Sequence, residues 1–131
     1  MPYHLTTKEF NDRVRAWLAD DGLYIVNIID GPSGHFLRAY LHTLRQTFRH
    51  VYPVFSVDSW RLSPRSTIVI LAGDTPLDLG AFQIVAPRSA PRLVSQQEID
   101  ASLTKGPTVT LTDRYAPVDQ MLLPVFLDVL P

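Results

Sequence analysis

Asp30 is the polar residue whose position most directly suggests chemistry. It follows the apolar run Leu23–Ile29 and precedes Gly31 and Pro32. Open α/β sheets bind ligands beyond the carboxyl ends of their strands, so an aspartate at this position is a candidate to border a pocket. The alternative is an aspartate that serves the turn itself, as aspartates before glycine and proline commonly do.

The remaining polar residues do not favour metal or nucleic-acid chemistry. The sequence contains no cysteine, which excludes disulfides, thiolate metal sites and cysteine nucleophiles. His35 and His42 share a helical face but lie about 10 Å apart along its axis, so we expect no metal site. The net charge is -1, and a basic stripe at helical spacing is usually a solvated helix face, so we expect no nucleic-acid partner. The stripe consists of Arg38, His42, Arg45 and Arg49.

Length and composition are those of one globular domain. The chain has 131 residues, of which 46% are hydrophobic and 19% charged, so we expect a single domain over residues 1–131. Its N-terminus has no basic segment followed by a long apolar stretch, and so does not resemble a secretory signal. The longest apolar run is about a third of the roughly 20 residues that a membrane helix needs. We therefore expect a cytoplasmic protein with no membrane partner.

Three apolar segments predict the strands that would position Asp30. Leu23–Ile29 is rich in β-branched residues and apolar at nearly every position, which is typical of a central, parallel strand covered on both faces. Val51–Val57 predicts a second strand, in which Pro53 favours an edge or a strand end because it has no amide hydrogen. Thr67–Ala72 predicts a third strand, short and continuously apolar.

Two amphipathic helices are predicted before and between these strands. Thr6 and Glu9 have the capping-box spacing, so a helix is expected from about Thr7. Its apolar stripe consists of Phe10, Val14, Trp17 and Leu18. A second amphipathic helix is expected from Phe36 to about His50.

The region after the third strand is less regular. Gly73–Pro91 contains three prolines and predicts an irregular excursion, with a short extended piece at Ala81–Val85. Ser95 and Glu98 repeat the capping-box spacing and open a short helix. Val109–Leu111 is expected to be extended.

Three segments of the chain resemble the spermidine-synthase-like family. They are PYHLTTKEF (Pro2–Phe10), DGLYIVNIID (Asp21–Asp30) and LTDRYAPVD (Leu111–Asp119). Their order and spacing extend over nearly the whole chain. The basic helix before VYPVF (Val51–Phe55) is also where this family places the helix ahead of its sixth strand.

The resemblance implies the C-terminal half of a truncated Rossmann-like fold, that of the S-adenosylmethionine-dependent methyltransferases. In this family the last of seven strands is antiparallel and inserted between the fifth and sixth. Leu23–Ile29, Val51–Val57 and Thr67–Ala72 would then be strands five, six and seven. We therefore expect an α/β protein with a small mixed sheet, two parallel strands plus an antiparallel last strand, and flanking helices. A helix between the first two strands and a short link before the third independently favour this order.

The resemblance places the cofactor-binding half outside this chain. The family binds its adenosyl cofactor after its first and second strands, and its catalytic aspartate follows the fourth. All of these precede the segment that resembles Pro2–Phe10. The turn Gly31–Gly34 lacks the G-x-G-x-x-G spacing. We therefore expect no catalytic and no cofactor-binding residue here, although S-adenosylmethionine or decarboxylated S-adenosylmethionine is implied for the full-length family.

The implied function is the substrate-side part of an aminopropyl- or methyltransferase, inactive on its own. In the full domain the corresponding tail lies near the substrate, where Asp113, Tyr115 and Asp119 would bind a cationic amine through charge-assisted hydrogen bonds. Asp30 would border the same pocket. The alternative is that Thr112 or Asp113 caps the last helix, Tyr115 packs and Asp119 is solvated.

A truncated sheet also predicts a partner. Leu23–Ile29 would pair with a fourth strand that the chain lacks, leaving an apolar edge with unpaired amides. We expect a homodimer, or a separate N-terminal half, to cover this edge. The alternative function is a non-catalytic oligomerisation or interaction module derived from the same fold.

Overall fold

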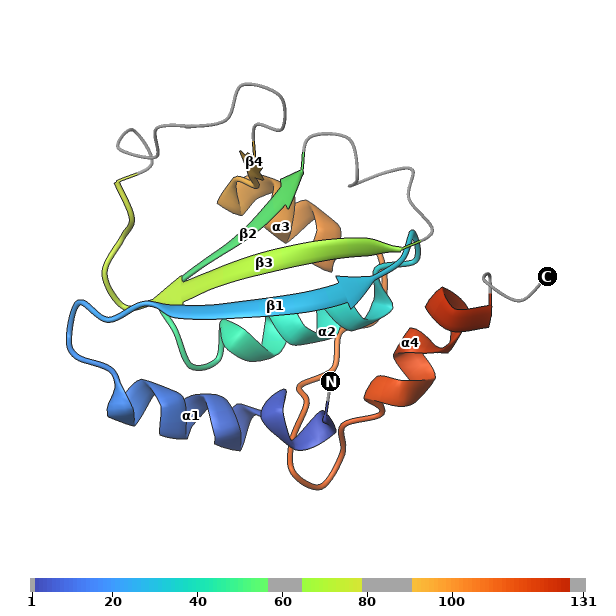
Figure 1. Ribbon diagram of the computed structural model, residues 1–131, viewed down its shortest axis with the longest axis horizontal. Helices are drawn as coiled ribbons and strands as arrows, with labels where there is room; N and C mark the ends of the chain where they lie inside the picture. The colour runs from blue at the N-terminus through green and yellow to red at the C-terminus, as the bar shows by residue number, and fades with distance from the viewer. Residues whose placement is uncertain (1, 57–64, 79–90, 128–131) are drawn as a thin grey trace.

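The computed structural model describes residues 2–56, 65–78 and 91–127. Within these ranges four strands form one sheet in the order β1-β3-β2-β4 (Figure 1). The strands are β1 (Tyr24–Asp30), β2 (His50–Ser56), β3 (Ser66–Gly73) and β4 (Pro91–Leu93).

The antiparallel strand β3 organises the sheet. It lies between β1 and β2 and pairs antiparallel with both, which confirms the predicted insertion of the third strand between the first two. The predicted mixed sheet needs correction in detail. β1 and β2 run in the same direction but share no ladder, because β3 separates them, so every pairing among the described strands is antiparallel. The sequence also gave no sign of β4, which is only three residues long.

Pro53 lies inside β2, which has β3 on one side and β4 on the other. This differs from the edge position that its missing amide predicted. Its carbonyl accepts a hydrogen bond from Val94 N at 3.1 Å. The N and O of one residue face the same side in antiparallel pairing, so the missing donor faces β4 where that short ladder ends, and the pairing with β3 is not weakened.

Helix α2 is the centre of the helical layer. It lies along the sheet and contacts β1, while α1, α3 and α4 each contact α2 (Figure 1). The helices are α1 (Lys8–Trp17), α2 (His35–Leu44), α3 (Gln96–Leu103) and α4 (Val118–Leu127), and a short 3-10 helix, η1 (Tyr3–Leu5), precedes α1. None of the helices in the described residues is long and apolar enough to span a membrane.

Strand β1 buries one face rather than two. Val26 and Ile28 belong to the hydrophobic core, whereas Ile25 is 61% exposed and Ile29 40% exposed. Successive side chains of a strand point to opposite faces, and the α2 layer covers the face of Val26 and Ile28. The expectation of a central strand covered on both faces was therefore wrong. Among the described strands β1 stands at the edge of the sheet.

Helix α1 is capped by Thr7 rather than Thr6. The Thr7 hydroxyl accepts a hydrogen bond from Phe10 N at 3.2 Å, whereas the Thr6 hydroxyl donates to Tyr3 O. The buried side chains of α1 are Asn11 and Val14, and Trp17 is 75% exposed. The inward stripe thus contains polar residues that an apolar pattern cannot reveal.

Two further element boundaries differ from expectation. Helix α2 ends at Leu44, after which Gln46 N donates to Thr43 O at 3.1 Å and Thr47 N to Leu44 O at 3.0 Å, in tighter turns of three residues. Helix α4 begins at Val118, so neither Thr112 nor Asp113 caps it. Pro124 lies inside this helix.

The capping box of Ser95 and Glu98 is confirmed at the start of α3. Residues 109–111 belong to no strand; instead Leu111 O accepts from Lys8 N at 2.7 Å. The extended piece expected at Ala81–Val85 lies outside the described residues.

Candidate functional site

Asp30 is buried at the end of β1, with 1% of its surface exposed. Its two carboxylate oxygens accept hydrogen bonds from Gly31 N and Leu37 N, each at 2.7 Å. Burial raises the pKa of Asp30 by more than these two hydrogen bonds lower it. The carboxylate therefore serves the turn and the first turn of α2, where Gly34 offers no side-chain cap.

Asp113 fastens the C-terminal tail to the start of α1. Its Oδ1 accepts a hydrogen bond from the Thr7 hydroxyl at 2.7 Å, and its Oδ2 lies 3.7 Å from the Arg13 guanidinium. Its own backbone N–H donates to the Glu9 carboxylate at 3.0 Å. Glu9, which the sequence assigned to a capping box, thus binds a segment about a hundred residues away in the chain.

Tyr115 and Asp119 remain exposed. Tyr115 pairs with Thr112 through two backbone hydrogen bonds of 3.0 Å, which close the turn that carries Asp113. The alternative to a substrate-binding role predicts that Tyr115 packs, but its side chain is 58% exposed. Asp119 lies exposed in the first turn of α4, where the helix dipole favours a negative charge.

The four predicted substrate residues do not all converge. Asp113 and Tyr115 share one turn and Asp119 follows in α4. Asp30, by contrast, directs its carboxylate to the backbone of α2. It is not a surface ligand.

A hollow of about 420 Å³ lies beside Asp113. It is lined by Tyr3, His4, Leu5, Phe10, Arg13 and Asp113. The rings of Tyr3 and His4 meet edge to face, with 5.7 Å between their centroids. Aromatic faces beside a carboxylate attract cationic groups, although Arg13 offsets part of the negative charge. The Pro2–Phe10 segment predicts a helix start and forms part of the family resemblance, but no local pattern in it predicts this lining.

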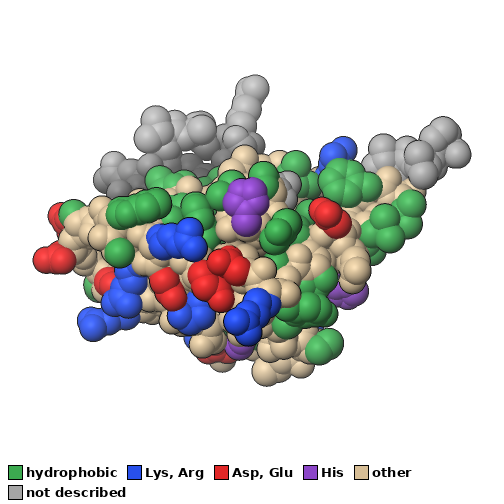
Figure 2. Space-filling view, turned by 90° about the horizontal axis from the view of Figure 1, so that it is seen from below, with side chains coloured by type: hydrophobic (Ala, Val, Ile, Leu, Met, Phe, Trp, Pro, Cys, Tyr) green, Lys and Arg blue, Asp and Glu red, His purple; other side chains and the backbone are tan. Residues whose placement is uncertain are grey.

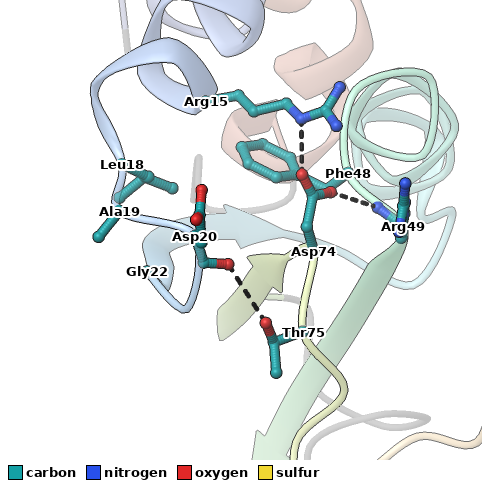
Figure 3. A pocket seen from close by; sticks show the side chains of 9 residues that line it. All are labelled: Arg15, Leu18, Ala19, Asp20, Gly22, Phe48, Arg49, Asp74 and Thr75. Carbon is teal, nitrogen blue, oxygen red and sulfur yellow. Dashed lines mark hydrogen bonds and ion pairs between the residues drawn. The ribbon is translucent and has the colours of Figure 1, made fainter.

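A second hollow, of about 430 Å³, opens at the other end of β1 (Figure 3). Its polar centre is Asp74, directly after β3. The Asp74 carboxylate accepts hydrogen bonds from Arg15 Nε at 2.7 Å and from Arg49 N at 3.2 Å. The Thr75 hydroxyl donates to Asp20 O at 3.2 Å across the opening. We call this the arginine hollow; its full lining is Arg15, Leu18, Ala19, Asp20, Gly22, Phe48, Arg49, Asp74 and Thr75.

The electrostatics of Asp74 follow from its two arginine neighbours. Burial acts to raise the pKa of Asp74, but the hydrogen bonds and positive charges of Arg15 and Arg49 outweigh it. The pKa of Asp74 therefore lies below its usual value. No motif predicted this cluster, because its members come from three separate parts of the chain.

The predicted basic stripe of α2 does not form one cationic surface. Arg45 pairs with Asp100 at 2.6 Å, and Arg38 donates to the Ser33 carbonyl at 2.7 Å. On the face seen in Figure 2, Lys and Arg side chains lie among Asp and Glu side chains. Among the described residues, no three His, Asp or Glu side chains gather as a metal site would require.

No family model and no curated protein matches this chain. Among solved structures, it is similar to the crystal structure of a probable spermidine synthase from Corynebacterium glutamicum ATCC 13032, with a TM-score of 0.66 and 16% sequence identity. The match covers 84% of this chain and 42% of that chain. The chain has a spermidine-synthase-like fold.

This likeness confirms, at the level of the fold, the resemblance seen in the sequence. The antiparallel insertion of β3 between β1 and β2 is the arrangement that the resemblance implied. The chain spans less than half of the length of the structure that it matches, and identity at this level carries the fold alone.

Proposed function

We propose that this chain is the C-terminal, substrate-side part of a spermidine-synthase-like aminopropyl- or methyltransferase, and that it is inactive on its own. The observation that carries the proposal is the match to a probable spermidine synthase over 84% of this chain but 42% of the other. The adenosyl cofactor, S-adenosylmethionine or its decarboxylated form, would bind to elements outside these residues.

The turn after β1 does not fit that cofactor. Gly34 N donates to Gly31 O at 3.0 Å, so the turn closes on itself. Leu37 N, in the first turn of α2, is already taken by the Asp30 carboxylate. A helix start whose amide is satisfied by an internal carboxylate is a poor site for an incoming anionic group. We therefore assign no catalytic or cofactor-binding residue to this chain.

Amine recognition is proposed for the tail. Tyr115 and Asp119 are exposed and make no side-chain hydrogen bond within the described residues. Asp113 lies beside them along the chain, although its carboxylate is partly used by Thr7. Asp30 contributes by positioning α2 rather than by contact. Carboxylates and a phenol hydroxyl are suitable acceptors for an ammonium group.

The open edge of β1 is the proposed partner surface. β1 has no neighbour on its outer side among the described strands, and Leu23, Ile25 and Ile29 are exposed. Unpaired strand edges with apolar side chains favour association. We propose that a second copy, or a separate N-terminal half, covers this edge. The cysteine-free sequence is compatible with the reducing cytoplasm that we propose as its location.

Calorimetry on the purified chain tests whether it binds an amine but not the adenosyl cofactor. We expect no micromolar binding of S-adenosylmethionine or its decarboxylated analogue. Putrescine, used as a probe diamine, should bind weakly, and Asp119→Asn should lower its affinity at least threefold, because the variant removes a charge. Asp21→Asn, an exposed carboxylate before β1, is the matched control. Micromolar cofactor binding by the chain alone would overturn the proposal, and equal losses in both variants would remove Asp119 from the site.

The second candidate is a non-catalytic oligomerisation or interaction module. The exposed apolar residues of β1 favour this candidate, because they can form an interface without any catalytic residue. The coding region upstream of Met1 separates the two candidates. An adjacent frame that encodes a glycine-rich strand-turn-helix, and whose product co-purifies one to one with this chain, would favour the transferase. The absence of such a frame would favour the module.

A further inference from the structure

Arg15 and Arg49 both line the arginine hollow, and each contributes one N–H group to the carboxylate of Asp74. Arg15 comes from the last turn of α1 and Arg49 from the residue before β2. Asp74 follows β3 and is hydrogen-bonded to both residues (Figure 3). Three separate element ends thus bring Arg15, Arg49 and Asp74 into one lining.

Several N–H donors of Arg15 and Arg49 form no hydrogen bond within the described residues. Arg15 uses Nε for Asp74, so its two terminal amino groups are available. Arg49 reaches Asp74 through its backbone N–H, and its guanidinium makes no hydrogen bond within the described residues. Guanidinium groups present several N–H donors in a fork that matches the oxygens of phosphate or carboxylate. Asp20 also lines the hollow and offsets part of the positive charge.

The floor of the arginine hollow is apolar. Phe48 is buried and Leu18 is partly buried, whereas Arg15, Asp20 and Arg49 are exposed to water. We propose that the arginine hollow binds a small phosphate-type oxyanion between the terminal amino groups of Arg15 and the guanidinium of Arg49.

This site is separate from the proposed substrate surface. The arginine hollow shares no lining residue with the hollow beside Asp113. The oxyanion proposal therefore does not depend on the transferase proposal.

The test is a titration of the ¹⁵N-labelled chain with inorganic phosphate at constant ionic strength, followed by amide chemical shifts. We expect saturable shifts at Gly22, Phe48 and Thr75, with a Kd below about 10 mM. Arg15→Ala and Arg49→Ala should each weaken binding at least tenfold. Asp20→Asn should strengthen it two- to threefold, because it removes a nearby negative charge.

Controls make the outcome decisive. Arg114→Ala removes an exposed arginine outside the arginine hollow and should leave the Kd unchanged. Because the Arg49 guanidinium holds no hydrogen bond to any residue that the structure describes, Arg49→Ala remains informative even if Arg15→Ala unfolds the chain. A parallel titration with glycerol 3-phosphate distinguishes a phosphate monoester, which should bind more tightly through the Phe48 floor, from free phosphate. The absence of saturation, or equal losses in the Arg49 and Arg114 variants, would overturn the site.

Discussion

Asp30→Ala is expected to lower the free energy of unfolding by about 3 kcal/mol. The change leaves Gly31 N and Leu37 N, which now donate to the carboxylate at 2.7 Å, without an acceptor at a buried position. Gly34, the N-cap of α2, has no side chain to replace it. Since α2 is the helix that α1, α3 and α4 contact, the loss should affect the whole fold. Urea denaturation followed by circular dichroism measures it.

Asp30→Asn separates the charge from the hydrogen bonds. The pKa of Asp30 is raised in the folded protein above its usual value of 3.8, because the carboxyl group is buried. The folded state therefore binds more protons between these two values, and the contribution of this group to stability falls as pH rises from 3.8 through the folded pKa. Asn lacks this titration, so the stability advantage of wild type over Asp30→Asn should shrink as pH rises from about 4 and then level off. An advantage that grows with pH, or an Asp30→Ala loss no larger than that of Asp21→Ala, would contradict the proposed role.

Lysines at the exposed face of β1 are expected to abolish association. The double variant Ile25→Lys, Ile29→Lys places two charges on the apolar surface that a second copy or N-terminal half would cover, and buried unpaired charges are strongly unfavourable at an interface. The dissociation constant should rise at least a hundredfold, or about 2.7 kcal/mol. Light scattering after size exclusion measures the mass: twice the 14.8 kDa of one chain for the wild-type homodimer and a single chain for the variant.

Gln97→Lys, on the exposed surface of α3, adds a charge away from β1 and should leave the mass unchanged. A wild-type chain that stays monomeric at micromolar concentration would exclude the homodimer. It would leave the N-terminal half as the remaining proposed occupant, which co-purification tests. An N-terminal half that binds the Ile25, Ile29 double variant as well as wild type would exclude the exposed face of β1 as the surface that it covers.

The strands and their order could be predicted because their signals are local. Continuous apolar runs located β1 and β3, and a helix followed by a short link allowed one antiparallel return between β1 and β2. The burial of β1 could not be predicted, because Ile25 and Ile28 are the same residue type on opposite faces. Only the position of α2 decides which of them enters the core.

The candidate sites were less predictable because their contacts join distant residues. Asp30 was located at a strand end, but its bond to Leu37 depends on how α2 starts. Asp113 was expected at a helix cap or a substrate pocket. Its carboxylate instead accepts a hydrogen bond from Thr7, which lies near the other end of the sequence. No local pattern brings Arg15 to Asp74, since tertiary packing alone places them together.

The position of β3 between two strands that precede it constrains how the protein can be made. While a ribosome is still synthesising the residues before Ser66, β1 and β2 are complete but have no partner for their ladders, because neither pairs with the other. The pairing of β1 and β2 with β3 forms only after Gly73 has emerged, when one late segment joins both, and β4 pairs with β2 later still. A nascent chain that stalls before that point exposes two apolar strands without partners. We expect chaperones to bind the protein in this form.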